Sequence, residues 1–300
     1  MSSPRLRRFL RYMAVLAMGR PLRGWERYRP FFIVGSGRCG STLLRAILEA
    51  HPDVHIPPEN DLRRAVRDYR WCSRLPWNVV LRIVLGQFEY HPAWGRWEIT
   101  LGPVFRELDA RPAGARDLAA VLEAVYRAHL RQHKPSAIRW GDKTPGNTFL
   151  LPELRAVFPD AQVIHMVRDG RDVVGSYMRI EKHDLSVTAR QWVQAVRAAQ
   201  AFGASHPSQY LEIRYEDLVR QPRENVQRVV TFLDLSFDER MLRHHELNLR
   251  FGDVERAAHL QGVWEPIHQK SIGRWRRELD TAQVAQLDRL LRPTLAALGY

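Results

Sequence analysis

The segment 31–44 contains the residue types of a phosphate-binding loop. It reads FFIVGSGRCGSTLL, which predicts a buried strand, a glycine-rich turn and a helix that begins at Ser41. Backbone N–H groups and the positive end of the helix dipole at such a junction favour an anion of phosphate size. Gly35, Gly40 and Thr42 fit the P-loop pattern G-x-x-x-x-G-K-[ST], but Ser41 replaces its lysine. Because that lysine contacts the β- and γ-phosphates of a nucleoside triphosphate, the loop is predicted to bind a different anion.

A second anion site is predicted after the hydrophobic strand expected over 161–167. Arg168 follows this strand, a helix is expected to begin just after it, and Ser176 lies eight residues further on. A guanidinium fork and a hydroxyl near the start of a helix make a good phosphate site. The alternative is that Arg168 pairs with Asp169 or Asp172 at a surface turn.

A carboxylate and a lysine are the candidates for acid–base and electrophilic chemistry. Glu59 follows a short second strand, and a carboxylate at the end of a parallel strand lies in the ligand crevice, where it can accept a proton. His51 and His55 are rival bases, although His51 is interpreted as a helix stop and His55 as a core residue. Lys143, in the expected turn 141–145, is one of four lysines among 46 basic residues and offers a compact, mobile cation.

Alternating strand and helix patterns must position these residues, and they predict an α/β fold with a P-loop-like parallel sheet flanked by helices. Residues 31–300 are expected to form one domain, with a mostly helical insertion over 60–135. The remaining strands are expected at 54–56 and 210–214, with a short extended piece at 137–139. Helices are expected at 41–50, 150–158, 170–178, 188–202, 216–233 and 281–297.

The charge of the chain favours anionic ligands. The formal net charge is +13, and residues 1–30 contribute eight arginines against one glutamate. We find no nucleic-acid-binding signature and no apolar run long enough to span a membrane. The first 30 residues have helical hydrophobic spacing, which leaves open a helix packed on the domain or peripheral contact with an anionic membrane. The cysteines, Cys39 and Cys72, suggest neither a disulfide framework nor a metal site, and a cytoplasmic location is expected.

Five motifs in this order resemble those of the sulfotransferases that use 3′-phosphoadenylyl sulfate (PAPS), over about residues 31–280. Residues 38–42 resemble the 5′-phosphosulfate loop R-[SC]-G-[ST]-T, and the segment of Arg168 and Ser176 resembles the one that grips the 3′-phosphate. Y-E-D-L at Tyr215 and S-I-G-R-W around Arg274 resemble two further cofactor segments. The resemblance implies these nucleotide-binding residues: Arg38, Cys39, Gly40, Ser41, Thr42, Arg168, Ser176, Tyr215 and Arg274.

The resemblance also implies catalytic roles. Glu59 matches the base of tyrosylprotein sulfotransferases and related bacterial enzymes, and Lys143 matches a lysine that stabilises the transition state. A gap-free count from the Arg274 motif places His259 where those enzymes have a stabilising serine, and whether His259 replaces that serine stays open. Arg38 and Lys143 are expected to bind the sulfuryl oxygens and the leaving phosphate, without a metal.

These observations predict a sulfotransferase that moves a sulfuryl group from PAPS to an acceptor hydroxyl in line. The acceptor class stays open among tyrosine, glycan, lipid and small molecule, and aromatic residues of the insertion are expected to select it. The alternatives are a P-loop kinase that uses ATP and a non-catalytic nucleotide-binding protein. The aromatic residues in question are Tyr69, Trp71, Trp77, Tyr90, Trp94 and Trp97.

Overall fold

A computed structural model describes residues 19–300 except 182, 248, 253, 256 and 257, and the side chains of 258 and 259. The sequence-based expectation of a helix or membrane contact at the N-terminus concerns mainly residues 1–18, which lie outside the described residues. Within the described part of the chain, no helix is both long and apolar enough to cross a membrane.

Five parallel strands form one sheet in the order β2-β3-β1-β4-β5, which confirms the predicted α/β fold with a parallel sheet. The central strand β1 pairs with β3 on one side and β4 on the other, so that Ile33 lies beside both Lys143 and Ile164. The strands are β1 (Phe31–Gly35), β2 (Val54–His55), β3 (Arg139–Lys143), β4 (Gln162–Val167) and β5 (Tyr210–Arg214).

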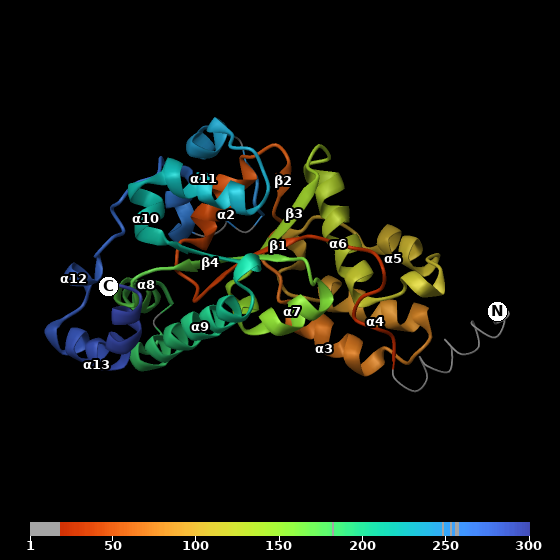
Figure 1. Cartoon of the computed structure of the whole chain (residues 1–300), viewed down its shortest axis with the longest axis horizontal. Coiled ribbons are helices and arrows are strands. Elements are labelled where there is room, and N and C mark those ends of the chain that lie inside the picture. Colours follow the sequence, from red (N-terminus) through yellow and green to blue (C-terminus); the bar gives the residue numbers. More distant parts are fainter. Residues whose placement is uncertain (1–18, 182, 248, 253, 256–257) are drawn as a thin grey trace.

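Helices cover both faces of the sheet because side chains along β1 alternate between two hydrophobic clusters. Phe31 and Ile33 pack with α2 (Ser41–Glu49), α10 (Tyr215–Arg220) and α11 (Pro222–Phe232). Phe32 and Val34 pack on the other face, where α7 (Leu151–Val157) and α9 (Leu185–Ser205) lie. Figure 1 shows α2, α10 and α11 above the sheet and α7 and α9 below it.

Two sequence-based expectations about these elements are wrong. The single helix expected over 216–233 is two helices, because Pro222 has no N–H to continue α10 and instead begins α11. The turn expected over 141–145 is largely strand, since β3 continues through Lys143. Gly141 suggests a turn in the sequence, but here it allows close packing: a Cβ at this position would lie 2.3 Å from the Phe31 ring.

The insertion over 60–135 is helical, as expected, and its aromatic residues differ in burial, with Trp94 partly buried. Tyr69, Trp77 and Trp97 are buried in the core, so they pack the insertion itself, whereas Trp71 and Tyr90 are exposed. The insertion consists of α3 (Leu62–Cys72), α4 (Trp77–Glu89), η1 (Trp94–Arg96), α5 (Gly102–Asp109), η2 (Ala113–Ala115) and α6 (Leu118–His133).

The remaining helices all follow β3 in the chain. The expected helices near 170 and 281 are α8 (Gly170–Glu181) and α13 (Thr281–Ala297). The sequence did not indicate α12 (Trp275–Glu278) or the short helices η3 (Pro145–Leu150), η4 (Pro207–Gln209), η5 (Glu239–Glu246) and η6 (Ala258–Trp264).

Asp142 is a buried carboxyl group in β3. Tyr126 donates a hydrogen bond of 2.6 Å to Asp142 Oδ2, Thr144 donates to the same oxygen, and Asn147 Nδ2 donates to Oδ1 at 2.8 Å. Burial raises the pKa of Asp142 to about 6, although these hydrogen bonds favour its ionised form. The charge on this strand therefore costs stability at neutral pH.

We expect Asp142→Asn to change how stability depends on pH. Between about pH 4 and 6 the unfolded chain has lost the Asp142 proton and the folded chain still holds it, so the wild-type protein loses stability as the pH rises. The variant has no such proton. Its free energy of unfolding should therefore rise relative to wild type by about 2 kcal/mol between about pH 4 and pH 7, measured by urea denaturation. The exposed Asp109→Asn is the control, and a difference that does not change with pH would contradict the assignment.

Candidate active site

The loop between β1 and α2 has the backbone conformation of an anion-binding concavity. Gly37, Arg38 and Gly40 have left-handed φ angles of 73°, 52° and 90°, and successive N–H groups in such turns converge on one point. A Cβ on Gly40 would lie 2.4 Å from the Tyr215 ring, so a larger residue does not fit there. The first N–H groups of α2 follow directly and add the positive end of its dipole.

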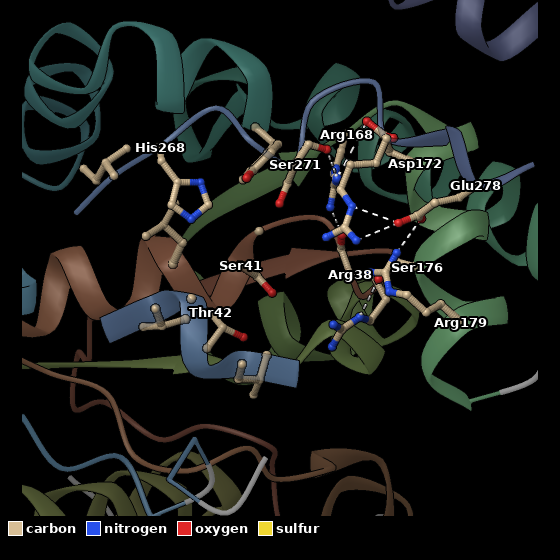
Figure 2. Close-up of a pocket in the computed structure, with 18 of the residues that line it drawn as sticks. Arg38, Ser41, Thr42, Arg168, Asp172, Ser176, Arg179, His268, Ser271 and Glu278 are labelled. Carbon is tan, nitrogen blue, oxygen red and sulfur yellow. Dashed lines mark hydrogen bonds and ion pairs between the residues drawn. The ribbon is translucent and has the colours of Figure 1, made fainter. Parts of the chain in front are cut away.

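A cavity of about 180 Å³ lies beside this loop, between α8 and the segment 260–278. Its charged lining consists of four guanidinium groups and two carboxylates, which leaves an excess of two positive charges. That excess matches a phosphate dianion. Figure 2 shows most of these side chains on one side of the cavity and His268 on the other, with Ser41 and Thr42 between them. The charged residues are Arg38, Arg168, Arg179, Arg274, Asp172 and Glu278.

Arg168 connects the loop to the C-terminal segment. It donates hydrogen bonds to the carbonyl oxygens of Arg38, at 3.2 Å, and of Ser271. Its guanidinium also lies 4.6 Å from the centre of the Tyr215 ring and 3.7 Å from the Asp172 carboxylate. The pairing with Asp172 that the alternative expects is present, but the expected surface position is wrong, because Arg168 is buried and lines the cavity.

Asp172 holds the C-terminal segment against α8. Its two carboxylate oxygens accept hydrogen bonds from the backbone N–H groups of Gly273, at 2.8 Å, and Trp275, at 2.9 Å. Asp172 is itself buried. The carboxylate therefore closes one wall of the cavity and places Arg274 in its lining.

The guanidinium of Arg38 lies beside Ser176, whose hydroxyl accepts a hydrogen bond of 3.3 Å from Arg38 Nε. Burial lowers the pKa of Arg38, and the neighbouring charges of Arg168 and Arg179 lower it further. An anion bound among these groups would relieve their mutual repulsion. Arg38 thus lies next to the residue that the sequence assigns to the 3′-phosphate.

Glu278 pairs with two arginines of the cavity wall. Its carboxylate accepts hydrogen bonds from Arg179 and from Arg274 Nε, the latter at 2.9 Å, and lies 2.6 Å from Arg274 Nη2. The sequence did not indicate Arg179 or Glu278. Arg179 lies three residues after Ser176 in α8, so the shared helix face was the available signal.

Lys143, Glu59 and Thr42 come together at the carboxyl ends of β3 and β1. The Lys143 side chain is only 1% exposed; its Nζ donates to Glu59 Oε1 and lies 3.3 Å from Thr42 Oγ1. The Glu59 side chain is 42% exposed, so solvent or a substrate can reach it. Two residues predicted from separate motifs thus form one ion pair in contact with the anion-binding loop.

The rival bases His51 and His55 have structural partners, which agrees with their interpretation from the sequence. His51 Nε2 lies 2.9 Å from the Ser236 carbonyl oxygen, and its Nδ1 accepts from Asp53 N. His55 is buried and pairs with Glu49, with 2.9 Å between Nδ1 and Oε1.

The sequence also assigns Cys39 and His259 to the site, but neither side chain is seen to line the cavity in the part of the chain that the structure describes. The Cys39 side chain is fully buried in the core cluster of β1 and α2, and burial raises its thiol pKa, so only its backbone is available to a ligand. The backbone of His259 lies in η6, but its side chain is outside the described part of the chain. His268, which the sequence did not indicate, lines the cavity, and its Nε2 lies 3.2 Å from Glu265.

A family model and two related sequences that match this chain all name sulfotransferases. A model of the sulfotransferase family matches residues 30–239. The chain is 28% identical over 282 residues to a putative protein-tyrosine sulfotransferase of Caenorhabditis briggsae, with 90% of this chain and 88% of that protein covered. It is 27% identical over 281 residues to protein-tyrosine sulfotransferase 1 of Danio rerio, with 90% and 71% covered.

Comparison of structures supports the same fold. The sulfotransferase domain of the olefin synthase of Synechococcus PCC 7002 superposes with a TM-score of 0.63 at 23% identity, over 90% of this chain and 97% of that domain. The sulfotransferase domain from the curacin biosynthetic pathway gives a TM-score of 0.58 at 18% identity, over 89% and 99%.

Proposed function

The chain belongs to the sulfotransferase family and transfers sulfuryl groups, and from this premise we propose that its donor is PAPS, that its acceptor is a hydroxyl group and that Glu59 is the general base. The contact of Lys143 with both Glu59 and Thr42 is the observation that carries this proposal. It joins a candidate base and a buried cation to the anion-binding loop.

The two ends of PAPS are assigned to two parts of the cavity. The backbone N–H groups of the loop, with the hydroxyls of Ser41 and Thr42, bind the 5′-phosphosulfate. Arg168 and Ser176 bind the 3′-phosphate, where Arg38 lies within hydrogen-bond distance of Ser176. The two excess positive charges of the lining support a ligand with this second phosphate.

The proposed reaction is an in-line displacement at sulfur. The acceptor oxygen forms a bond to sulfur, the bond from sulfur to the 5′-phosphate oxygen breaks, and 3′,5′-ADP leaves. The hydroxyl proton passes to Glu59, whose exposed position allows an acceptor to approach. Lys143 and the loop N–H groups stabilise charge on the sulfuryl oxygens and the leaving phosphate.

The ion pair between Lys143 and Glu59 has a role in this scheme. A buried ammonium group needs a counter-charge, and Glu59 supplies it when no donor is bound. An incoming sulfuryl group offers Lys143 other oxygen atoms, which frees Glu59 to accept a proton. The same cation thus stabilises the resting site and the transition state.

A tyrosyl hydroxyl is the acceptor that the sequence relatives support, since those reported above are named protein-tyrosine sulfotransferases. The kinase alternative is not favoured. Ser41 stands where a kinase P-loop has its lysine, and the family match is to sulfotransferases.

We expect the protein to bind 3′,5′-ADP more tightly than 5′-AMP, and Arg168→Ala to remove most of that preference. A charged hydrogen-bonded contact contributes about 1.5–3 kcal/mol, which corresponds to about a ten- to hundred-fold loss of 3′,5′-ADP affinity by calorimetry. Arg223→Ala, which breaks an exposed ion pair with Glu239, is the control. Equal affinity for the two nucleotides before and after the Arg168 change would refute the assignment.

We expect Glu59→Gln to lower kcat by about 10²–10⁴-fold with PAPS and a tyrosine-containing peptide, because the amide keeps the shape of the side chain and cannot take up the proton. Its affinity for 3′,5′-ADP should stay close to that of wild type. His51→Gln is the control. Near-full activity of Glu59→Gln beside an inactive His55 variant would transfer the role of base to histidine.

We expect transfer to continue in EDTA, because preorganised N–H groups and Lys143 handle the charge in this scheme. The measurement is the rate of 3′,5′-ADP release from PAPS before and after chelation. Activity that disappears in EDTA and returns with magnesium would favour a metal-dependent mechanism.

A further inference from the structure

Helix α2 contains a buried arginine, Arg45, one turn beyond the anion-binding loop. We propose that Arg45 is the positioning residue that holds the proposed base Glu59 at a fixed place relative to Ser41 and Thr42. The inference rests on the proposed function of Glu59 and assigns no contact between Arg45 and either substrate.

Arg45 is a buried cation that donates hydrogen bonds to two backbone carbonyl groups. Arg45 is only 1% exposed, and its Nε and Nη2 donate hydrogen bonds to the Ile56 carbonyl oxygen at 3.1 and 2.9 Å. Nη2 also donates to the Phe251 carbonyl oxygen at 3.2 Å, and the guanidinium lies 4.8 Å from the centre of the Phe251 ring. One planar group thus joins α2 to the segment after β2 and to a segment about 200 residues further along the chain.

Glu49, one turn further along α2, binds the backbone N–H of Ile56, the residue whose carbonyl group Arg45 binds. Its carboxylate accepts hydrogen bonds from Ile56 N, at 2.7 Å, and from His55 Nδ1. Burial opposes ionisation of Glu49, but the hydrogen bond and charge of His55 and the charge of Lys134 outweigh it and lower its pKa. Both the N–H and the C=O of Ile56 are therefore bound by charged side chains of one helix.

The short segment from Ile56 to Glu59 is rigid, so the position of Ile56 fixes that of Glu59. The two residues between them are Pro57 and Pro58, which fix φ and have no N–H to form other hydrogen bonds. On the far side of Glu59, Asn60 N donates to Thr144 Oγ1 at 3.0 Å. The chain is thus fixed by Arg45 and Glu49 on the N-terminal side of Glu59 and by Thr144, which follows Lys143, on its C-terminal side.

Helix α2 therefore positions both the anion-binding loop, where the donor is proposed to bind, and the proposed base Glu59. Arg45 lies four residues after Ser41, about one helical turn, so the loop and the Ile56 contact are joined through continuous hydrogen-bonded helix. The Phe251 contact adds the segment beside Pro58, where a Cβ on Gly252 would lie 3.2 Å from Pro58 Cγ. A displacement of Arg45 would move Glu59 without changing any group that touches the nucleotide.

The test compares Arg45→Lys with wild type on two phenolic acceptors and PAPS. Lysine keeps the charge but cannot donate to both carbonyl groups in the fixed geometry of a guanidinium. With a tyrosine-containing peptide, which must lose its proton to a base, kcat should fall by about 10²-fold, the effect of a misplacement near 1 Å. With 4-nitrophenol at mildly alkaline pH, already ionised, the rate should change by less than about threefold, and the Kd for 3′,5′-ADP should not change.

Arg139→Lys is the matched control. Arg139 is a partly buried arginine that also donates to a backbone carbonyl, that of Leu233, and lies over a phenylalanine ring, at 5.6 Å. It begins β3, at the opposite edge of the sheet from the site. This variant should show equal, small effects on both acceptors.

Amide hydrogen exchange provides a readout that needs no acceptor. Exchange over residues 54–60 should become faster in Arg45→Lys and in the second variant, Glu49→Gln, while exchange over 36–42 should not change. Equal losses on both acceptors, or unchanged exchange over 54–60, would overturn the proposal. If Glu59→Gln itself is fully active on the peptide, the proposed base is wrong, and this outcome is separate from a failure of Arg45→Lys alone.

Discussion

Parallel strands bring their carboxyl ends to one edge of a sheet, and the site depends on this constraint. β1 ends at the anion-binding loop, β4 ends before Arg168, and β3 ends at Lys143. The chain leaves β1 toward β2 and β3 on one side and later returns to β4 and β5 on the other, so β1 is the switch point where such sheets bind ligands. Arg38 and Arg168 line the cavity, and Lys143 with Glu59 joins its lining through Thr42, because the strands before these residues are held in register. Helix α2 then ties the base to the loop.

The second constraint is charge. Three cations of the site have internal partners: Lys143 has Glu59, Arg168 has Asp172 and two carbonyl groups, and Arg274 has Glu278. Such pairs offset the cost of removing cations from water, and they place the cations before a ligand arrives. The cavity lining still has two more guanidinium groups than carboxylates. The site therefore favours a polyanion while the protein remains stable without one.

Much of this site was predictable because its parts are local in sequence. The strand–loop–helix pattern at 31–44 and the helix after Arg168 are read from neighbouring residues, and both form as expected. Lys143 was expected in a turn because Gly141 and Asp142 are rare in strands; only packing against Phe31 and hydrogen bonds from distant residues explain the strand. The sequence indicates Asp172 only as an alternative partner of Arg168. The contacts of Asp172 with Gly273, of Glu278 with Arg179 and of Arg45 with Phe251 could not be predicted, because they join residues about 100, 100 and 206 positions apart. Contacts of that kind are a property of the fold and have no local pattern.

Mass spectrometry of the products tests the proposed transfer of a sulfuryl group from PAPS to a hydroxyl. The purified chain would be incubated with PAPS and a tyrosine-containing peptide, and separately with ATP and the same peptide. We expect the peptide to gain one sulfuryl group on tyrosine, with one 3′,5′-ADP formed for each modified peptide and no change with ATP. A peptide that stays unmodified with PAPS and gains a phosphoryl group from ATP would contradict the proposed transfer.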